Sequence, residues 1–186
     1  MTARDVIVVD VETNGLDINR HQVVEVAWWN LGTSERGQFI PPHNVSDVLA
    51  QADIDALRIN RYIDRIAGAE QDRIGEAAFE LGEALHGNTI AGANPAFDTR
   101  FLTKMFSGYQ DRELCGAPRW HHRLLDVSAY TAGVLGLPPT ELPGLSAVCE
   151  LLGVTNPAPH TAEGDVTATG NCFLRLFDRA GNRLPT

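Results

Sequence analysis

The chain has 186 residues and a formal net charge of −9, from 15 basic and 24 acidic residues. This length supports one domain with a full hydrophobic core, and 44% hydrophobic with 21% charged residues is an ordinary globular composition. The negative charge argues against a protein that coats nucleic acid by neutralising phosphates. It does not exclude an enzyme that meets a phosphodiester through bound metal ions.

The cysteines and the apolar runs indicate the cellular compartment of the protein. Cys115, Cys149 and Cys172 lack metal-ligand spacing and cannot all pair, which is typical of reduced core residues in an intracellular protein. No signal peptide precedes the first strand, and no apolar run is long enough to cross a bilayer. We therefore expect a cytoplasmic protein without a membrane partner.

The first predicted element is a buried strand that starts at Val6, is rich in β-branched residues and ends at the turn signal Asn14-Gly15. A hairpin-like loop leads to a second strand over 23–31, and a third at 38–40 stops at Pro41-Pro42. The later elements are predicted as short helices over 43–66, a helix over 74–85, a strand over 89–92, a helix over 97–106, a strand over 124–127, and helices over 145–152 and 162–177. This order predicts a mixed sheet covered by helices in one domain, 1–186.

Two acids, Asp10 and Glu12, stand at the end of the first predicted strand. Because side chains alternate along a strand, both project from the same side. Two buried carboxylates repel each other unless a cation joins them, and Mg²⁺ prefers such oxygen ligands. The alternative is a strand that ends in solvent with its last two acids exposed.

Three further acids and one histidine follow predicted strand ends or helix starts. Helix capping explains Asp98 and Asp126 equally simply, and for Asp126 it is the preferred interpretation. His160 lies in a proline-held loop, and Asp165 lies in the first turns of the last helix. Together, four carboxylates and a histidine fit two-metal phosphoryl chemistry better than a hydrolase based on Ser or Cys.

These residues resemble the DEDDh, or DnaQ-like, branch of the 3′→5′ exonucleases, which includes the proofreading epsilon subunit of DNA polymerase III, ribonuclease T and oligoribonuclease. The D-x-E-T motif stands as Asp10-Val11-Glu12-Thr13, the second motif as Asn94-Pro95-Ala96-Phe97-Asp98, and H-x-x-x-x-D runs from His160 to Asp165. The resemblance covers roughly residues 5 to 177 in the correct order. It implies an α/β, ribonuclease H-like fold: a mixed five-stranded sheet, its first three strands antiparallel, flanked by helices.

The resemblance also implies a metal-dependent exonuclease that hydrolyses DNA from the 3′ end and releases nucleoside 5′-monophosphates. Two divalent cations, Mg²⁺ or Mn²⁺, would be bound by Asp10, Glu12, Asp98 and Asp165. His160 would be the general base that takes a proton from the attacking water. Four residues would contact the terminal nucleotide: Thr13, Leu16, Asn94 and Phe97. For Leu16, expected to wedge against the last base, and for Phe97, near the sugar, core packing is the alternative.

Two positions depart from the family pattern, and several alternatives stay open. Asn14 stands where the family often has Thr, and Asn60-Arg61-Tyr62-Ile63 replaces a common His-Gly-Ile. Arg179–Thr186 is short for a polymerase-binding tail, which favours a stand-alone nuclease over a polymerase-bound one. Proofreading and DNA repair are the expected roles, and a homodimer is possible. RNA is the alternative substrate, distinguished by a contact to the 2′-hydroxyl. A binding module that lost its chemistry is disfavoured because no motif residue is missing.

Overall fold

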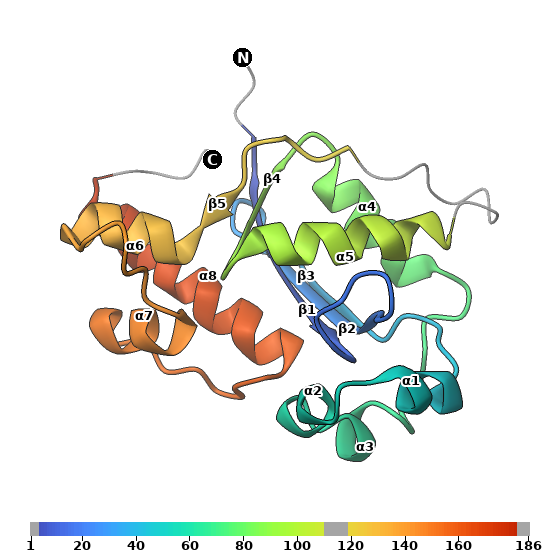
Figure 1. The fold of residues 1–186 in the computed structure, drawn as a ribbon. Helices are drawn as coiled ribbons and strands as arrows, with labels where there is room; N and C mark the ends of the chain where they lie inside the picture. Colours follow the sequence, from blue (N-terminus) through green and yellow to red (C-terminus); the bar gives the residue numbers. More distant parts are fainter. Residues whose placement is uncertain (1–3, 110–118, 182–186) are drawn as a thin grey trace.

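The computed structural model describes residues 4–109 and 119–181, so Cys115 and the end of the C-terminal tail lie outside the described residues. The described chain forms a five-stranded sheet with helices around it (Figure 1). The strands are β1 (Val6–Thr13), β2 (Val23–Asn30), β3 (Arg36–Phe39), β4 (Thr89–Gly92) and β5 (Leu125–Asp126). Their order in space is β3-β2-β1-β4-β5, which makes β1 the central strand.

The strand directions confirm the predicted fold class. β1 pairs antiparallel with β2, and β2 pairs antiparallel with β3. β4 runs parallel to both β1 and β5. The parallel strands end at the same edge of the sheet, so the residues that follow them meet near the end of β1.

Eight helices accompany the sheet in the described residues, and seven of them fall where helices were predicted. They are α1 (Val45–Gln51), α2 (Ile54–Ile59), α3 (Tyr62–Arg65), α4 (Glu76–Leu85), α5 (Pro95–Ser107), α6 (Val127–Leu135), α7 (Leu145–Leu152) and α8 (Ala162–Arg179). The sequence analysis did not predict α6. Asp126 is the N-cap of this helix and accepts hydrogen bonds from the N–H groups of Ser128 and Ala129, so the capping interpretation of Asp126 is confirmed.

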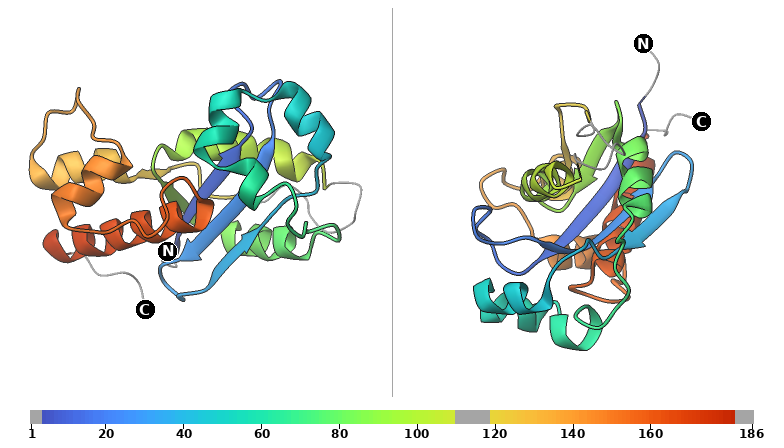
Figure 2. Two further views of the ribbon diagram at one scale, coloured as in Figure 1. Left: turned by 90° about the horizontal axis from the view of Figure 1, so that it is seen from below. Right: turned by 90° about the vertical axis from the view of Figure 1, so that its right-hand side faces the viewer.

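Alternating side chains of β1 enter two separate hydrophobic layers. Val8 packs with residues of α6, α7 and α8 on one face of the sheet. Ile7 and Val9 pack with residues of α4 and α5 on the other. Figure 2 shows α5 and α8 on opposite sides of the sheet. Asp10 and Glu12 share the alternation of Val8, and therefore stand on the face that α8 covers.

α8 lies unusually close to the sheet at one glycine. A Cβ atom added to Gly170 would come within 2.3 Å of the Trp29 ring, so only glycine lets the helix approach β2 at this point. Cys149 of α7 and Cys172 of α8 are buried and free, with their sulfur atoms 3.8 Å apart, as expected for reduced core cysteines.

The short helices α1 to α3 form a separate layer below the ends of β1 and β2 (Figure 1). Val24, Val48, Tyr62 and Ile66 form its small core. Among residues 4–109 and 119–181, no helix combines the length and apolar character needed to span a membrane.

Candidate active site

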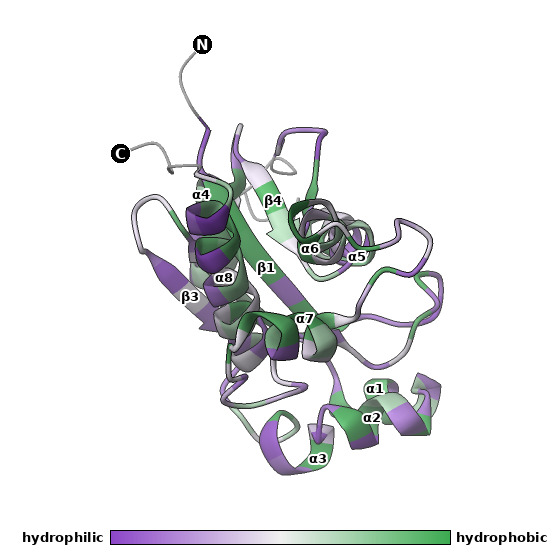
Figure 3. Cartoon of the chain, turned by 90° about the vertical axis from the view of Figure 1, so that its left-hand side faces the viewer, coloured by the Kyte–Doolittle hydropathy of each residue, from purple (hydrophilic) through white to green (hydrophobic). Residues whose placement is uncertain are grey.

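The site begins with the two acids of β1. Glu12 and Asp10 are half-buried and stand opposite Glu25 and Ala27 of β2 in the strand register. Figure 3 shows β1 as a largely hydrophobic strand that carries a hydrophilic band. The acids are therefore neither exposed in solvent nor enclosed in the core, and the alternative of a strand that simply ends in water is wrong.

The first turn of α8 brings a third acid to this position. Thr161 is the N-cap of the helix, and its hydroxyl accepts a 3.0 Å hydrogen bond from the Gly164 N–H. Asp165 follows in the first turn, half-buried and facing β1. One carboxylate oxygen from each of Asp10, Glu12 and Asp165 lies within 4.8 Å of the other two. Acids 155 positions apart in the sequence thus share one location.

Asp98 approaches the same strand from α5. Asn94, not Asp98, occupies the N-cap position of that helix, so Asp98 is not its cap, although it lies in the first turn, where an acid suits the helix dipole. Asp98 is 3% exposed, and its Oδ1 accepts a 3.1 Å hydrogen bond from the backbone N–H of Val11. Asp98 lies outside the group of three carboxylates, but its charge acts directly on Asp10.

The electrostatics show four acids that lack enough compensating charge. Burial, followed by the charges of Asp98, Glu12 and Asp165, raises the pKa of Asp10 well above its ordinary value. Burial also raises the pKa of Glu12 to about 7 and that of Asp98 to about 7. The pKa of Asp165 is raised too, again mainly by burial. Such perturbed acids gathered in one place are typical of a functional site.

The loop before α8 holds Asp165 and presents His160. Asn156 Nδ2 donates a 2.5 Å hydrogen bond to Asp165 Oδ1, and the Thr161 hydroxyl donates to the Ala158 carbonyl. His160 adopts a left-handed backbone with φ of 60°, and its side chain is exposed. The hydrogen bond from Asn156 and then the charge of His160 lower the pKa of Asp165, partly opposing the effect of burial. His160 therefore stands outside the helix, as predicted, and within electrostatic reach of the acids.

The structure separates the four predicted substrate contacts into two kinds. Leu16 has 75% of its surface exposed, so core packing of Leu16 is excluded. Asn94 is exposed as well, with a left-handed φ of 67°. Thr13 is buried, and its hydroxyl donates to the Gly15 carbonyl. Phe97 is half-buried and packs against the ring of Phe101 with 4.8 Å between centroids.

Sequence reasoning missed the residues that hold the loop of Leu16 in place. Asn14 accepts from the Gln22 N–H and donates to the Val48 carbonyl. His21 is 1% exposed, and its Nδ1 accepts from the Asp17 N–H. Asn14 had been noted only as a departure from the family pattern, and no local signal pointed to His21.

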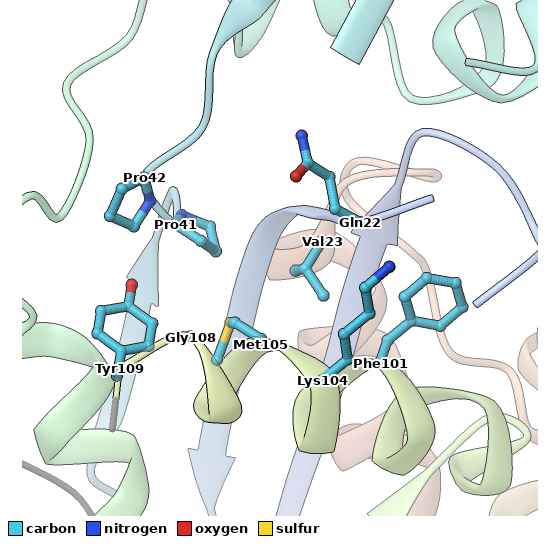
Figure 4. A pocket seen from close by; sticks show the side chains of 9 residues that line it. All are labelled: Gln22, Val23, Pro41, Pro42, Phe101, Lys104, Met105, Gly108 and Tyr109. Carbon is cyan, nitrogen blue, oxygen red and sulfur yellow. The ribbon is translucent and has the colours of Figure 1, made fainter. Parts of the chain in front are cut away.

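A cleft of about 240 Å³ lies beside this loop, between α5 and the ends of β2 and β3. Figure 4 shows Phe101, Lys104 and Met105 along its α5 side, with Pro41 and Pro42 opposite. None of the predicted acids lines it. The cleft is therefore distinct from the cluster of carboxylates.

The donor set fits hard divalent cations. The three close ligand groups are all carboxylates, which is the ligand type that Mg²⁺ and Mn²⁺ prefer. Their raised pKa values show that repulsion and burial are not relieved by the protein alone. A bound divalent cation would supply positive charge at this position.

The mixed sheet, with carboxylates gathered at the end of its central strand, agrees with a family of exonucleases. The model of the exonuclease family RNase_T matches residues 7–173. The chain belongs to this family.

Three similar proteins illustrate the relationship. A DNA polymerase III subunit epsilon-like protein of Rhodobacter capsulatus is 34% identical over 107 residues, which cover 54% of this chain and 14% of that protein. E. coli Exonuclease I, solved with a dT13 oligonucleotide, has a TM-score of 0.70 at 17% identity, covering 94% of this chain and 41% of that one. The nuclease domain of 3′hExo, a DEDDh family member bound to rAMP, has a TM-score of 0.68 at 14% identity, covering 99% and 96%. The chain thus spans less than half of the first two proteins.

Proposed function

We propose that this protein is a metal-dependent 3′→5′ exonuclease that removes nucleoside 5′-monophosphates from the 3′ end of DNA. The observation that carries the proposal is the convergence of Asp10, Glu12 and Asp165 within 4.8 Å, with Asp98 behind them on α5. Membership of an exonuclease family supports the reaction class. The single-stranded oligonucleotide bound to E. coli Exonuclease I supports a single-stranded or frayed 3′ end as the substrate.

In this proposal each residue of the site has a role in metal binding, proton transfer or substrate binding. Asp10, Glu12, Asp98 and Asp165 would hold two divalent cations. When bound, the cations would supply activation of the attacking water and stabilisation of the leaving oxygen. Exposed His160 accepts the proton of the attacking water, and Asn156 keeps Asp165 oriented by its hydrogen bond. Leu16 and Phe97 contact the terminal nucleotide through apolar surface, which tolerates any base.

RNA is the second candidate substrate, and one comparison favours it. The chain resembles 3′hExo over nearly the whole of both chains, and that domain was solved with rAMP. Distinguishing RNA from DNA requires a contact to the 2′-hydroxyl. Rates measured on matched single-stranded DNA and RNA oligomers decide between the two substrates.

The proposal is tested with a 5′-labelled single-stranded oligonucleotide. We expect a ladder that shortens from the 3′ end with Mg²⁺ or Mn²⁺ and disappears with chelator. Asp10→Ala and Asp165→Asn should abolish the ladder. Glu163→Gln is the matched control, because Glu163 is exposed two positions before Asp165 on the same helix. Digestion by Asp10→Ala at the wild-type rate would refute the site, and binding without turnover would favour a non-catalytic module.

A further inference from the structure

A fifth acid, Glu25, stands directly opposite Glu12 on the sheet. The strand register pairs these two residues across β1 and β2, so their side chains share one face. Directly opposed Cβ atoms lie about 4.5–5.5 Å apart, and like charges in this arrangement repel each other. Glu25 is 2% exposed, yet its oxygens are not part of the three-carboxylate group. Something must hold this carboxylate away from its neighbours.

Arg65 of α3 holds the Glu25 carboxylate by two parallel hydrogen bonds. Arg65 Nη1 lies 3.1 Å from Glu25 Oε1, and Arg65 Nη2 lies 3.0 Å from Glu25 Oε2. This paired geometry fixes the direction of the carboxylate as well as its charge. Gln38 Nε2 adds a third bond of 2.9 Å to Oε1. Glu25 is therefore turned toward Arg65 and β3.

The same pair connects both sides of the candidate active site. Glu25 Oε2 also accepts a 3.2 Å hydrogen bond from the backbone N–H of Ala162, the first residue of α8. Arg65 donates twice to the carbonyl of Asn60, at 3.1 and 2.8 Å. The Asn60 side chain donates in turn to the carbonyl of Thr13, the last residue of β1. The end of β1 and the start of α8 are thus joined through Arg65 and Glu25.

We propose that Arg65 and Glu25 form a positioning pair for the cation site. Arg65 keeps Glu25 from acting as a competing fifth ligand beside Glu12, and Glu25 holds the start of α8 at the distance that places Asp165 against β1. The inference rests on the proposed function, because it assumes that Asp10, Glu12 and Asp165 bind divalent cations. Neither residue touches the reacting atoms.

Removing the two partners one at a time has opposite electrostatic consequences. Without Arg65, the uncompensated negative charge of Glu25 faces Glu12 and adds a possible ligand, so cation binding tightens. The same added ligand displaces the cations from the positions required for catalysis. Without Glu25, the guanidinium of Arg65 remains beside Glu12 without its partner and opposes cation binding. A pair that only stabilised the fold would weaken binding in both variants.

The experiment measures Mn²⁺ binding by titration calorimetry at one pH that is kept the same for all variants. We expect Arg65→Met to bind Mn²⁺ at least about tenfold more tightly and Glu25→Gln at least about tenfold more weakly, because each removes one unit charge close to a divalent ion. The double variant should return close to the wild-type affinity. Arg58→Met is the matched control, because Arg58 is an exposed α2 residue that pairs with exposed Asp55. Circular dichroism confirms that each variant is folded.

Turnover provides the second measurement. We expect Arg65→Met to lower kcat about a hundredfold, the effect of a misplacement near 1 Å, despite tighter Mn²⁺ binding. Adding Glu25→Gln should restore part of that loss. If Arg65→Met fails to fold, Arg65→Gln tests the charge alone: Mn²⁺ binding should still tighten, while kcat should fall less because an N–H donor for Glu25 is kept.

Three outcomes separate the possibilities. Opposite shifts in Mn²⁺ affinity with recovery in the double variant support the positioning pair. Shifts of the same sign in both single variants, or none, overturn it and leave a structural ion pair. If the wild-type protein binds no Mn²⁺, the fault lies with the proposed function rather than with the pair.

Discussion

The carboxylate of Asp98 accepts a 3.1 Å hydrogen bond from the backbone N–H of Val11, the residue between Asp10 and Glu12 on β1. β4 pairs with β1 only as far as Val8, so Asp98 satisfies a donor that no neighbouring strand reaches. One acid of α5 is therefore fixed to the backbone that carries two others. Asp98 has a structural task in addition to its proposed catalytic one.

Two substitutions of Asp98 should separate these tasks. Asp98→Ala leaves the buried Val11 N–H without a partner, and we expect a loss of about 1–3 kcal/mol of unfolding free energy together with loss of activity. Asp98→Asn keeps an acceptor oxygen, so it should lose activity while unfolding close to the wild type. Urea denaturation in the presence of chelator measures the unfolding free energy of each variant, and the oligonucleotide assay measures its activity. Equal destabilisation by the two variants would contradict the role of this hydrogen bond.

The raised pKa values predict how stability changes with pH when cations are absent. Folded Glu12 and Asp98 keep their protons up to about pH 7, whereas the unfolded chain releases them near pH 4. The folded state therefore binds more protons between these values, and its stability falls as pH rises from about 4 to about 7. Cations need ionised carboxylates, so the stabilisation by Mn²⁺ should increase over the same range.

Thermal unfolding at about pH 5 and about pH 8, with chelator and with Mn²⁺, tests this expectation. In chelator, Glu12→Gln should reduce the loss of stability that accompanies rising pH. Glu163→Gln, which changes an exposed acid, should not reduce it. Activity at limiting Mn²⁺ should rise as pH passes about 7. Identical pH slopes for Glu12→Gln and the wild type would show that Glu12 does not carry the effect.

Local patterns predicted most of the sheet and the positions of the acids. β1 and β4 are short apolar runs bounded by turn residues, and the apolar spacing of α8 is visible in the sequence. α6 was missed because small residues and Gly133 interrupt its apolar pattern, and only Val127, Thr131 and Ala132 are buried. Its packing depends on α7 and α8, which local sequence does not specify.

Contacts between residues far apart in the sequence could not be predicted from the sequence. Glu25 was visible as an acid in an apolar strand, but its partner Arg65 is 40 positions away on a four-residue helix. The exposure of Leu16 depends on how Asn14 and His21 fold the loop around it. These relationships follow from the topology of the chain and not from residue spacing.

The exposure of Leu16 predicts a substitution that changes substrate binding without changing stability. Leu16 is 75% exposed, so Leu16→Ala removes little buried surface from the folded protein. Loss of its apolar contact with the terminal base should raise KM about tenfold, from partial burial of a leucine side chain. Steady-state kinetics and thermal unfolding measure the two effects. Leu142→Ala, at an exposed leucine in the loop before α7, is the control, and an unchanged KM for Leu16→Ala would remove Leu16 from the substrate contacts.

The hydrogen bonds of Lys104 predict that this lysine stabilises the loop that carries Leu16. Its Nζ donates to the carbonyls of Ile18 and His21, both at 2.7 Å, and so joins this loop to α5 beside the cleft in Figure 4. Lys104→Met removes both bonds, and we expect faster hydrogen exchange at the amides of residues 16–21. KM should rise because Leu16 is less well positioned, while kcat stays close to the wild type because the acids are unaffected.

Arg100→Met is the matched control, since Arg100 is an exposed residue one turn earlier on α5. Its exchange rates and KM should equal those of the wild type. A fall in kcat with constant KM for Lys104→Met would mean that Lys104 acts on the carboxylates and not on the loop. Unchanged exchange at residues 16–21 would mean that Asn14 and His21 hold the loop without the lysine, because their hydrogen bonds anchor its two ends independently.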